Sequence, residues 1–177
     1  CGEDDRIAFV FERHGNRIHS CKRCSLEFSF PQPTDETLAS IYSSEYFLGS
    51  KDEHSLKRQE FLKRATARLY LEALRPFVPN DRPRLLEIGC GSGDFLVEAQ
   101  SWGFEIEGLE YSGHAVNDAN ARLGTPAVRA GSPEEKCLPD GAYDVIAAFD
   151  VVEHLRDPRK AIEYLRAALR PKGLLAT

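Results

Sequence analysis

Three glycines at alternate positions, Gly89, Gly91 and Gly93, follow the apolar run at residues 85–88. Glycine lets the backbone turn sharply, and it lets a ligand lie against the main chain without a side chain in the way. Glu110 follows the next apolar run, and a carboxylate there can accept hydrogen bonds from both hydroxyl groups of a ribose. The spacing therefore predicts a nucleoside-binding site formed by the glycine loop and this acid.

The charges around the loop bear on which ligand it takes. A dinucleotide-binding fold requires G-x-G-x-x-G, and Asp94 stands where that pattern needs its third glycine. Glu87, at the end of the first apolar run, places negative charge where a diphosphate should lie, whereas a cationic amino-acid ligand tolerates it. These two acids disfavour a nucleotide-dependent oxidoreductase, which stays the more distant alternative.

Such a site must be positioned by a sheet, and the sequence beyond residue 84 has the pattern of one. Short apolar runs alternate with helical stretches, which is typical of a parallel sheet covered by helices. Strands are predicted at residues 85–88, 104–109, 126–129 and 143–149 and after Gly173, and helices at 94–102, at 112–123 and from Pro158, with Asp157 as N-cap. We expect an α/β fold with a doubly wound, mostly parallel sheet and helices on both faces, truncated after the fifth strand. Because ligands bind such sheets at the carboxyl ends of the strands, chemistry is expected just after residues 88, 109, 129 and 149.

The segments before the sheet differ from it in character. A helix is predicted at residues 55–77, with an inward apolar face at spacings of three and four made by Leu62, Ala65, Leu69, Ala73 and Phe77. The first 48 residues have no sustained helical period and predict a small irregular N-terminal unit. The expected organisation is a leader at 1–48, a connecting helix and linker at 49–80 and the main domain at 81–177.

Five segments in order resemble the motifs of class I S-adenosylmethionine-dependent methyltransferases. Residues 85–95 are similar to the first motif, two hydrophobic residues, Glu, a hydrophobic residue and Gly-x-Gly-x-Gly, and residues 108–112, 130–134, 143–158 and 169–175 are similar to the later ones. The resemblance implies a Rossmann-like fold that transfers a methyl group from S-adenosylmethionine to a small-molecule oxygen or carbon acceptor. A noncatalytic S-adenosylmethionine-binding or zinc-scaffold module is the nearest alternative.

The resemblance also implies cofactor contacts at the strand ends, made by Glu87, Gly89, Cys90, Gly91, Gly93, Glu110, Tyr111, Ser132, Pro133, Phe149 and Asp150. Glu87 would lie near the methionine amine, Glu110 would hold the ribose hydroxyls and Tyr111 would lie against the adenine. Ser132 departs from the aspartate that the family often has there. A purely structural role, that of a small residue that fills space, is the alternative for Cys90. Cys137 is expected to be an inert buried thiol.

His154 and Asp150 are the candidate catalytic residues. Histidine titrates close to neutral pH and can take a proton from a hydroxyl acceptor. The run at residues 151–158 also resembles the corresponding segment of ubiquinone-biosynthesis O-methyltransferases. Two interpretations of His154 stay open, a substrate-facing base and a residue that caps or packs the short helix there.

A cysteine pair marks the leader. Cys21 and Cys24 have the spacing of one zinc knuckle, and Cys1 could belong to a second. Residues 13–47 resemble the zinc-ribbon-like leader found before some methyltransferases that act on nucleotide sugars or related metabolites. That resemblance implies Cys1, Cys21 and Cys24 as metal ligands, with His14, His19 or a lost residue completing the set; an empty knuckle is the alternative.

Composition narrows the partners. The chain has 177 residues with 23 Lys+Arg against 28 Asp+Glu, a net charge of -5, which argues against nucleic acid or an anionic membrane as partner. No apolar run approaches the ~18 residues that cross a bilayer, and five cysteines lack the density of a disulfide scaffold. We expect a cytoplasmic protein whose partner is a small-molecule methyl acceptor. The composition does not indicate whether the chain is a monomer or an oligomer.

Overall fold

The computed structural model describes residues 7–41, 53–78 and 81–177. The backbone divides into two compact units, Cys1–Ile41 and Tyr42–Thr177. In the smaller unit the described residues form an antiparallel sheet in the order β1-β2-β3, made by β1 (Ile7–Arg13), β2 (Asn16–Cys21) and β3 (Glu27–Ser29) and followed by α1 (Asp35–Ile41). The predicted zinc-ribbon-like character of this unit stays a prediction.

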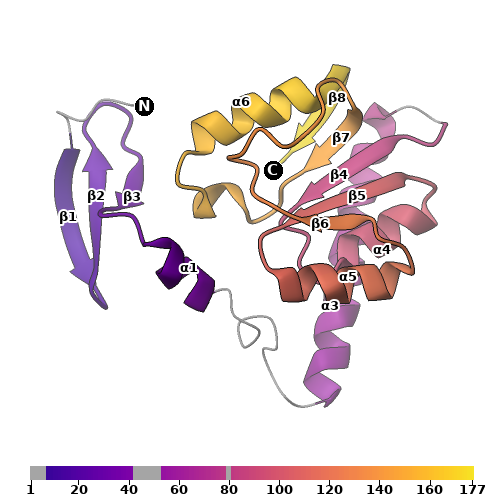
Figure 1. Cartoon of the computed structure of the whole chain (residues 1–177), viewed down its shortest axis with the longest axis horizontal. Helices are drawn as coiled ribbons and strands as arrows, with labels where there is room; N and C mark the ends of the chain where they lie inside the picture. Colours follow the sequence, from indigo (N-terminus) through magenta and orange to yellow (C-terminus); the bar gives the residue numbers. More distant parts are fainter. Residues whose placement is uncertain (1–6, 42–52, 79–80) are drawn as a thin grey trace. The chain divides into compact units, whose positions relative to one another are not determined.

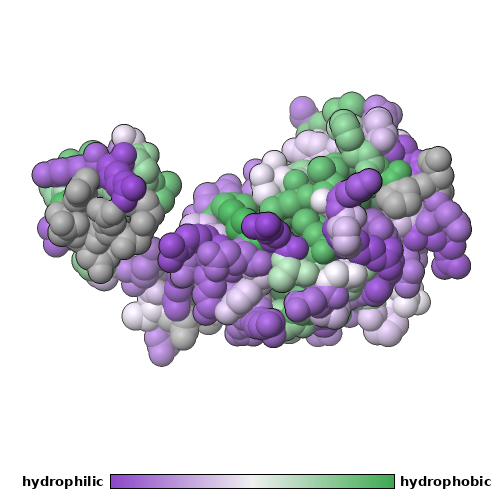
Figure 2. Space-filling view, turned by 90° about the horizontal axis from the view of Figure 1, so that it is seen from above, coloured by the Kyte–Doolittle hydropathy of each residue, from purple (hydrophilic) through white to green (hydrophobic). Residues whose placement is uncertain are grey.

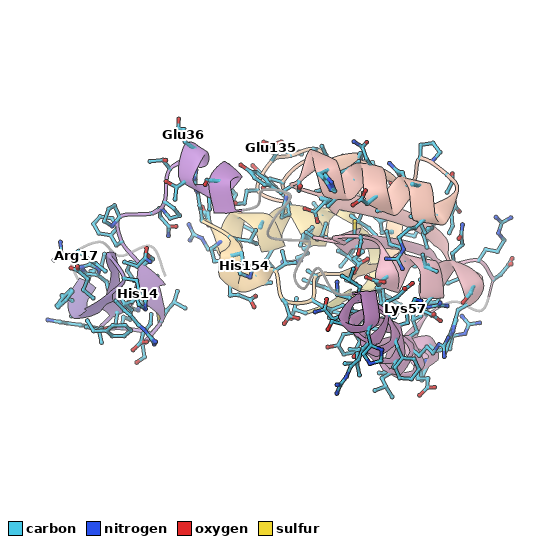
Figure 3. All side chains as sticks on the ribbon, turned by 90° about the horizontal axis from the view of Figure 1, so that it is seen from below. His14, Arg17, Glu36, Lys57, Glu135 and His154 are labelled. Atoms are coloured by element: carbon cyan, nitrogen blue, oxygen red, sulfur yellow. The ribbon has the colours of Figure 1, made fainter. Side chains whose placement is uncertain are left out.

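A row of aromatic rings crosses the small sheet. His19 pairs with Phe9 on β1 and with Phe28 on β3, and its ring centroid lies 5.7 Å and 6.4 Å from theirs. The guanidinium of Arg17 lies 5.3 Å from the Phe9 ring centroid, and Figure 3 labels Arg17 together with His14 at the β1–β2 turn. Cross-strand ring contacts of this kind stabilise a small sheet that has little room for a core of its own.

The larger unit contains a parallel sheet in the order β6-β5-β4-β7-β8 (Figure 1). Its elements are α3 (Glu53–Leu74), η2 (Arg75–Phe77), β4 (Arg84–Ile88), α4 (Asp94–Ser101), β5 (Glu105–Glu110), α5 (Gly113–Leu123), β6 (Val128–Ala130), β7 (Tyr143–Ala147), η3 (Val152–His154), α6 (Pro158–Ala168) and β8 (Leu169–Ala176). The first strand, β4, lies in the middle, and later strands add on both sides of it. The expected doubly wound sheet is confirmed, and the chain changes direction at the junction of β4 and β7, where such sheets bind ligands.

Two apolar cores lie on the two faces of this sheet. Successive strand residues point to opposite faces, so Leu85 joins a core with α3, α4 and α5, whereas Leu86 joins a core with Leu165 of α6. Figure 1 shows α6 on one side of the sheet and α4 and α5 on the other. Figure 2 shows apolar residues among polar ones at the surface of the larger unit, and the edge strand β8 leaves Leu174 and Leu175 only half-buried.

The predicted inward face of the long helix is wrong. Leu62 and Leu69 are exposed, and α3 instead buries Ala67, Leu71 and Leu74 against the sheet. Arg64 and Arg68, both partly exposed, reach the carboxylate of Glu98 on α4, which ties the helix in this rotation.

The ends of two predicted elements also differ. The fourth strand ends at Ala147, and the fifth begins at Leu169, inside the stretch predicted as a turn. Tyr143 pairs with Leu169 but Val145 pairs with Leu174, so extra residues bulge out of β8 there. The cap before α6 is as predicted, since the Asp157 carboxylate accepts a hydrogen bond from the Lys160 N–H at 3.0 Å.

Candidate functional site

The glycine loop joins β4 to α4 at the carboxyl edge of the sheet. Gly89, Gly91 and Gly93 have φ of 66°, 50° and 78°, in the left-handed region that favours glycine. A Cβ added to Gly89 would lie 2.6 Å from Cγ2 of Val151, whereas one added to Gly91 would meet nothing within 4 Å. The first glycine is therefore needed for close packing, and the second leaves open space in front of the main chain.

Glu110 ties this loop to the end of β5. One carboxylate oxygen accepts the Gly91 N–H at 2.9 Å, and the other accepts the Ser112 N–H at 2.9 Å. The side chain is buried, and each of its oxygens has a further lone pair to offer a ligand. Glu110 is thus placed, as predicted, where it could accept ribose hydroxyls beside the loop.

Glu87 lies at the end of β4, two residues before the loop begins, and is 8% exposed. Its Oε2 has no hydrogen-bond partner among the described residues. Burial, followed by the nearby charges of Asp94 and Glu110, raises the pKa of the Glu87 carboxyl well above its ordinary value. An unpaired acceptor in a buried position is costly, and a ligand amine would remove that cost.

The acidic group around the loop therefore has three members, Glu87, Asp94 and Glu110. All three are buried, and the charges of Asp94 and Glu110 both act on Glu87. The group favours a cationic ligand over a diphosphate, which agrees with the expectation from the sequence.

Phe149 follows β7 and packs between two rings. Its centroid lies 4.2 Å from that of Tyr70 on α3 and 5.4 Å from that of Phe95 on α4. Phe149 is half-buried, and Tyr70 is 38% exposed. The sequence predicts no role for Tyr70, because nothing in the helical period links residue 70 to residue 149. The aromatic side chains flank the carboxyl end of β7 next to the glycine loop.

Three further predicted residues lie at the loops after β5 and β6. Tyr111 is half exposed directly after β5, and Pro133 is buried. The Ser132 hydroxyl accepts the Glu134 N–H at 3.2 Å, which shapes the turn after β6.

Cys90 and Cys137, the two cysteines of the larger unit, differ in burial. The Cys90 side chain is buried in the core beside Gly108, where a Cβ would come within 2.9 Å of its sulfur, and burial raises the pKa of the thiol. Its side chain fills space in this core, as the sequence predicted. Cys137 is not the buried thiol expected: it is exposed, and its Sγ donates to the Ser132 carbonyl at 3.6 Å.

His154 and Asp150 lie in the connection from β7 to α6, and Figure 3 labels His154 there. Both are exposed. Asp150 has φ of 54°, a strained value for a residue that is not glycine. The structure places both beyond the end of β7 as expected, and their chemical roles stay predictions.

The cysteine pair of the leader occupies the turn between β2 and β3. Cys21 is buried and Cys24 exposed, and the N–H groups of Cys24 and Arg23 hydrogen-bond the Cys21 sulfur and lower the pKa of its thiol. Within residues 7–41, 53–78 and 81–177, no three His, Cys, Asp or Glu side chains gather as a metal site. Cys1, and residues 42–47 of the leader resemblance, lie outside the described residues, so the zinc ligands stay a prediction.

A family model described as "Methyltransferase domain" matches residues 56–177, from α3 to the end of the sheet. The chain belongs to this methyltransferase domain family. The doubly wound sheet and the glycine loop were expected from the sequence pattern, and the match begins within α3, upstream of the main domain predicted at residues 81–177.

Curated relatives and solved structures agree on this family. The chain is 33% identical over 93 residues to a probable S-adenosylmethionine-dependent methyltransferase of Mycolicibacterium smegmatis, a match covering 51% of this chain and 35% of the relative. It is 27% identical over 126 residues to a ubiquinone biosynthesis O-methyltransferase of Rickettsia conorii, covering 68% of this chain and 44% of the relative. The chain thus spans less than half the length of these two relatives.

Among solved structures, the chain is similar to an amino pentose methyltransferase from Micromonospora echinaspora with S-adenosylmethionine bound. The TM-score is 0.57 at 27% identity, and the match covers 71% of this chain and 55% of that one. None of the helices in the described parts of the chain is long and apolar enough to cross a membrane.

Proposed function

We propose that this chain binds S-adenosylmethionine and forms part of an enzyme that methylates a small-molecule oxygen or carbon acceptor. The observation that carries the proposal is the buried Glu87 Oε2, unpaired among the described residues, beside a loop whose Gly91 faces open space. The methionine ammonium of this ligand is the kind of donor that such a carboxylate lacks. When bound, the ligand supplies a methyl group on a positively charged sulfur, which a nucleophile can displace.

The chain's own residues divide the binding between them. The main chain at Gly89, Gly91 and Gly93 flanks the ligand, and Glu110 accepts the ribose hydroxyls while it keeps the Gly91 N–H. Tyr111 lies against the adenine, and the turn at residues 132–133 borders the same side. An uncompensated diphosphate would meet the acidic group instead of donors, which disfavours a dinucleotide.

The acceptor side is assigned to the residues after β7. Phe149, packed against Tyr70, excludes water from the methionine end, and Asp150 follows it. A methyl transfer needs the nucleophile, methyl and sulfur in line and shielded from water, so positioning carries most of the catalysis. His154 would take the proton of a hydroxyl acceptor. The relatives named as O-methyltransferases favour oxygen over carbon as the acceptor atom.

Calorimetric titration tests the ligand assignment. S-adenosylmethionine and S-adenosylhomocysteine should bind, NADH should not, and replacement of Glu110 by Gln should weaken binding of both adenosyl ligands. Binding of NADH alone, or of none of the three, would overturn the proposal. Formation of S-adenosylhomocysteine with a panel of hydroxylated small molecules then separates an enzyme from a binding module.

For the smaller unit we propose a zinc site that uses Cys21, Cys24 and Cys1. Support comes from the turn at Cys21, whose sulfur already accepts main-chain hydrogen bonds that favour the thiolate, the form that binds metal. Metal analysis of carefully purified protein should find zinc, and the same preparation of a Cys21→Ser, Cys24→Ser double variant should lose it. Protein that carries essentially no zinc, with or without those cysteines, would dismiss the site.

A further inference from the structure

Arg122 sits in the last turn of α5 and reaches three groups on other elements. Its Nη1 donates to the Ser92 carbonyl in the middle of the glycine loop at 3.4 Å. Its Nη2 lies 2.9 Å from Oδ1 of Asp94 and 2.9 Å from Oε1 of Glu60 on α3. The guanidinium therefore joins the loop, the first turn of α4 and the long helix α3.

The loop needs such support because its own side chains supply little. Gly91 has open space where a side chain would be, and glycine has more backbone freedom to lose than any other residue. Cys90 buries the start of the loop in the core, so it is the middle of the loop that depends on polar contacts to its main chain. Glu110 holds it at the Gly91 N–H, and Arg122 holds it one residue later at the Ser92 carbonyl.

The two contacts differ in what a ligand does to them. Glu110 is expected to share its carboxylate with a ribose, whereas Arg122 donates to the Ser92 carbonyl and lies beside the carboxylates of Asp94 and Glu60. Asp94 is held further by Ser92 Oγ at 3.0 Å and lies 3.6 Å from the Lys63 ammonium. The contacts of Arg122 can thus shape the loop both before and after a ligand arrives.

We propose that Arg122, anchored by Asp94 and Glu60, is a positioning residue that fixes the glycine loop in the form that receives the methyl donor. The proposal rests on the assignment of S-adenosylmethionine to this site. It deepens that assignment because it makes the affinity depend on a residue that does not touch the ligand.

A purely electrostatic effect of Arg122 predicts something different. Arg122 partly neutralises Asp94, a member of the acidic group, so its removal would make the site more negative. S-adenosylmethionine carries one more positive charge than S-adenosylhomocysteine. A charge effect would therefore increase the affinity for S-adenosylmethionine relative to that for S-adenosylhomocysteine. Loss of positioning would weaken both to the same extent.

Calorimetric titration of both ligands with Arg122→Gln, Arg122→Lys and Arg68→Gln separates these effects. Arg68 is the matched control, since it also joins α3 to α4, through Glu98 at 2.9 Å, without touching the loop. Arg122→Gln should weaken the binding of both ligands about tenfold, equal to about 1.4 kcal/mol. The affinity of Arg122→Lys should also lie well below that of the wild type, because an ammonium cannot reproduce the planar, forked hydrogen bonding of a guanidinium. Wild-type affinity in Arg122→Gln, a selective gain for S-adenosylmethionine, or an equal loss in Arg68→Gln would overturn the proposal.

Amide hydrogen exchange of the ligand-free chain gives a second readout. Exchange in residues 89–95 should accelerate in Arg122→Gln and stay as in wild type in Arg68→Gln, while both variants lose similar thermal stability. Glu60→Gln removes only one of the three contacts of Arg122 and keeps those to Ser92 and Asp94, so it should show a smaller acceleration in the same segment. Unchanged exchange in every Arg122 and Glu60 variant would refute the positioning role. Accelerated exchange in a chain that does not bind S-adenosylmethionine would refute the proposed function alone.

Discussion

Replacement of Glu87 by Gln tests the acidic site most directly, because the change keeps the shape and removes the charge. A hydrogen bond between a buried carboxylate and a ligand ammonium contributes about 1.5–3 kcal/mol, so Glu87→Gln should weaken S-adenosylmethionine roughly 10- to 150-fold. Glu105→Gln is the control, since that exposed acid lies at the opposite end of β5. Calorimetric titration measures both, and equal affinities of wild type and Glu87→Gln would refute the reasoning.

The pH dependence of the same variant gives an independent check. The pKa of Glu87 is raised in the folded protein. Glu87 therefore contributes fully to the stability of the ligand-free protein below its unfolded pKa of ~4.3. That contribution is lost as the pH rises through the folded value. Urea denaturation should therefore show Glu87→Gln gaining stability relative to wild type as the pH increases. A difference that stays flat or runs the other way would count against a buried, protonated Glu87.

Ligand binding should then displace a proton. An ammonium that pairs with Glu87 favours the ionised carboxylate, so binding lowers the raised pKa of Glu87 and releases a proton at pH values between its free and bound pKa. The affinity for S-adenosylmethionine should rise with pH below about pH 7, before the ligand's own amine titrates. The binding heat should vary with the ionisation enthalpy of the buffer in wild type and not in Glu87→Gln. Equal heats in all buffers for wild type would contradict this account.

Three further outcomes are expected. Gly89→Ala should lower stability by about 1–3 kcal/mol, measured by thermal denaturation, because its Cβ would lie 2.6 Å from Cγ2 of Val151; a stability equal to wild type would contradict the packing. The hydrogen bonds from Arg68 and Arg64 lower the pKa of Glu98. Its contribution to folding stability is therefore present above the unfolded pKa and is lost as the pH falls through the folded pKa. Arg68→Gln should make the stability fall less steeply at acidic pH, and an unchanged dependence at acidic pH would contradict this. His154→Gln should reduce turnover of a hydroxyl acceptor by about 100-fold and leave the affinity for S-adenosylmethionine as it is; unchanged turnover would remove His154 from the chemistry.

The parts of the site that come from consecutive residues could be predicted from the sequence. The alternating glycines predict a sharp turn of the backbone after the first strand, and Gly89, Gly91 and Gly93 adopt the left-handed conformation that glycine permits. Strand alternation sends Leu85 and Leu86 to opposite cores, as a buried parallel strand requires. These features depend on local backbone geometry, which a short stretch of sequence determines.

The parts that depend on distant residues could not be predicted. The long helix carries two apolar stripes of the same period, and its packing on the sheet together with the contacts of Arg64 and Arg68 to Glu98 decides which one is buried. Tyr70 meets Phe149, which is far from it along the chain, and no spacing rule links them. The exposure of Cys137 likewise follows from the path of the loop after β6 and not from its own neighbours. Pairs like these are settled by how the helices rest on the sheet.

The burial of Ala67, Leu71 and Leu74 against the sheet has a practical meaning for anyone who wishes to transplant this module. A fragment that begins at β4 would expose the apolar surface that those three side chains now cover. It would also lack Glu60, which pairs with Arg122, and Lys63, which pairs with Asp94. A usable graft has to begin upstream of the long helix, so the smallest portable version of the module is larger than its sheet.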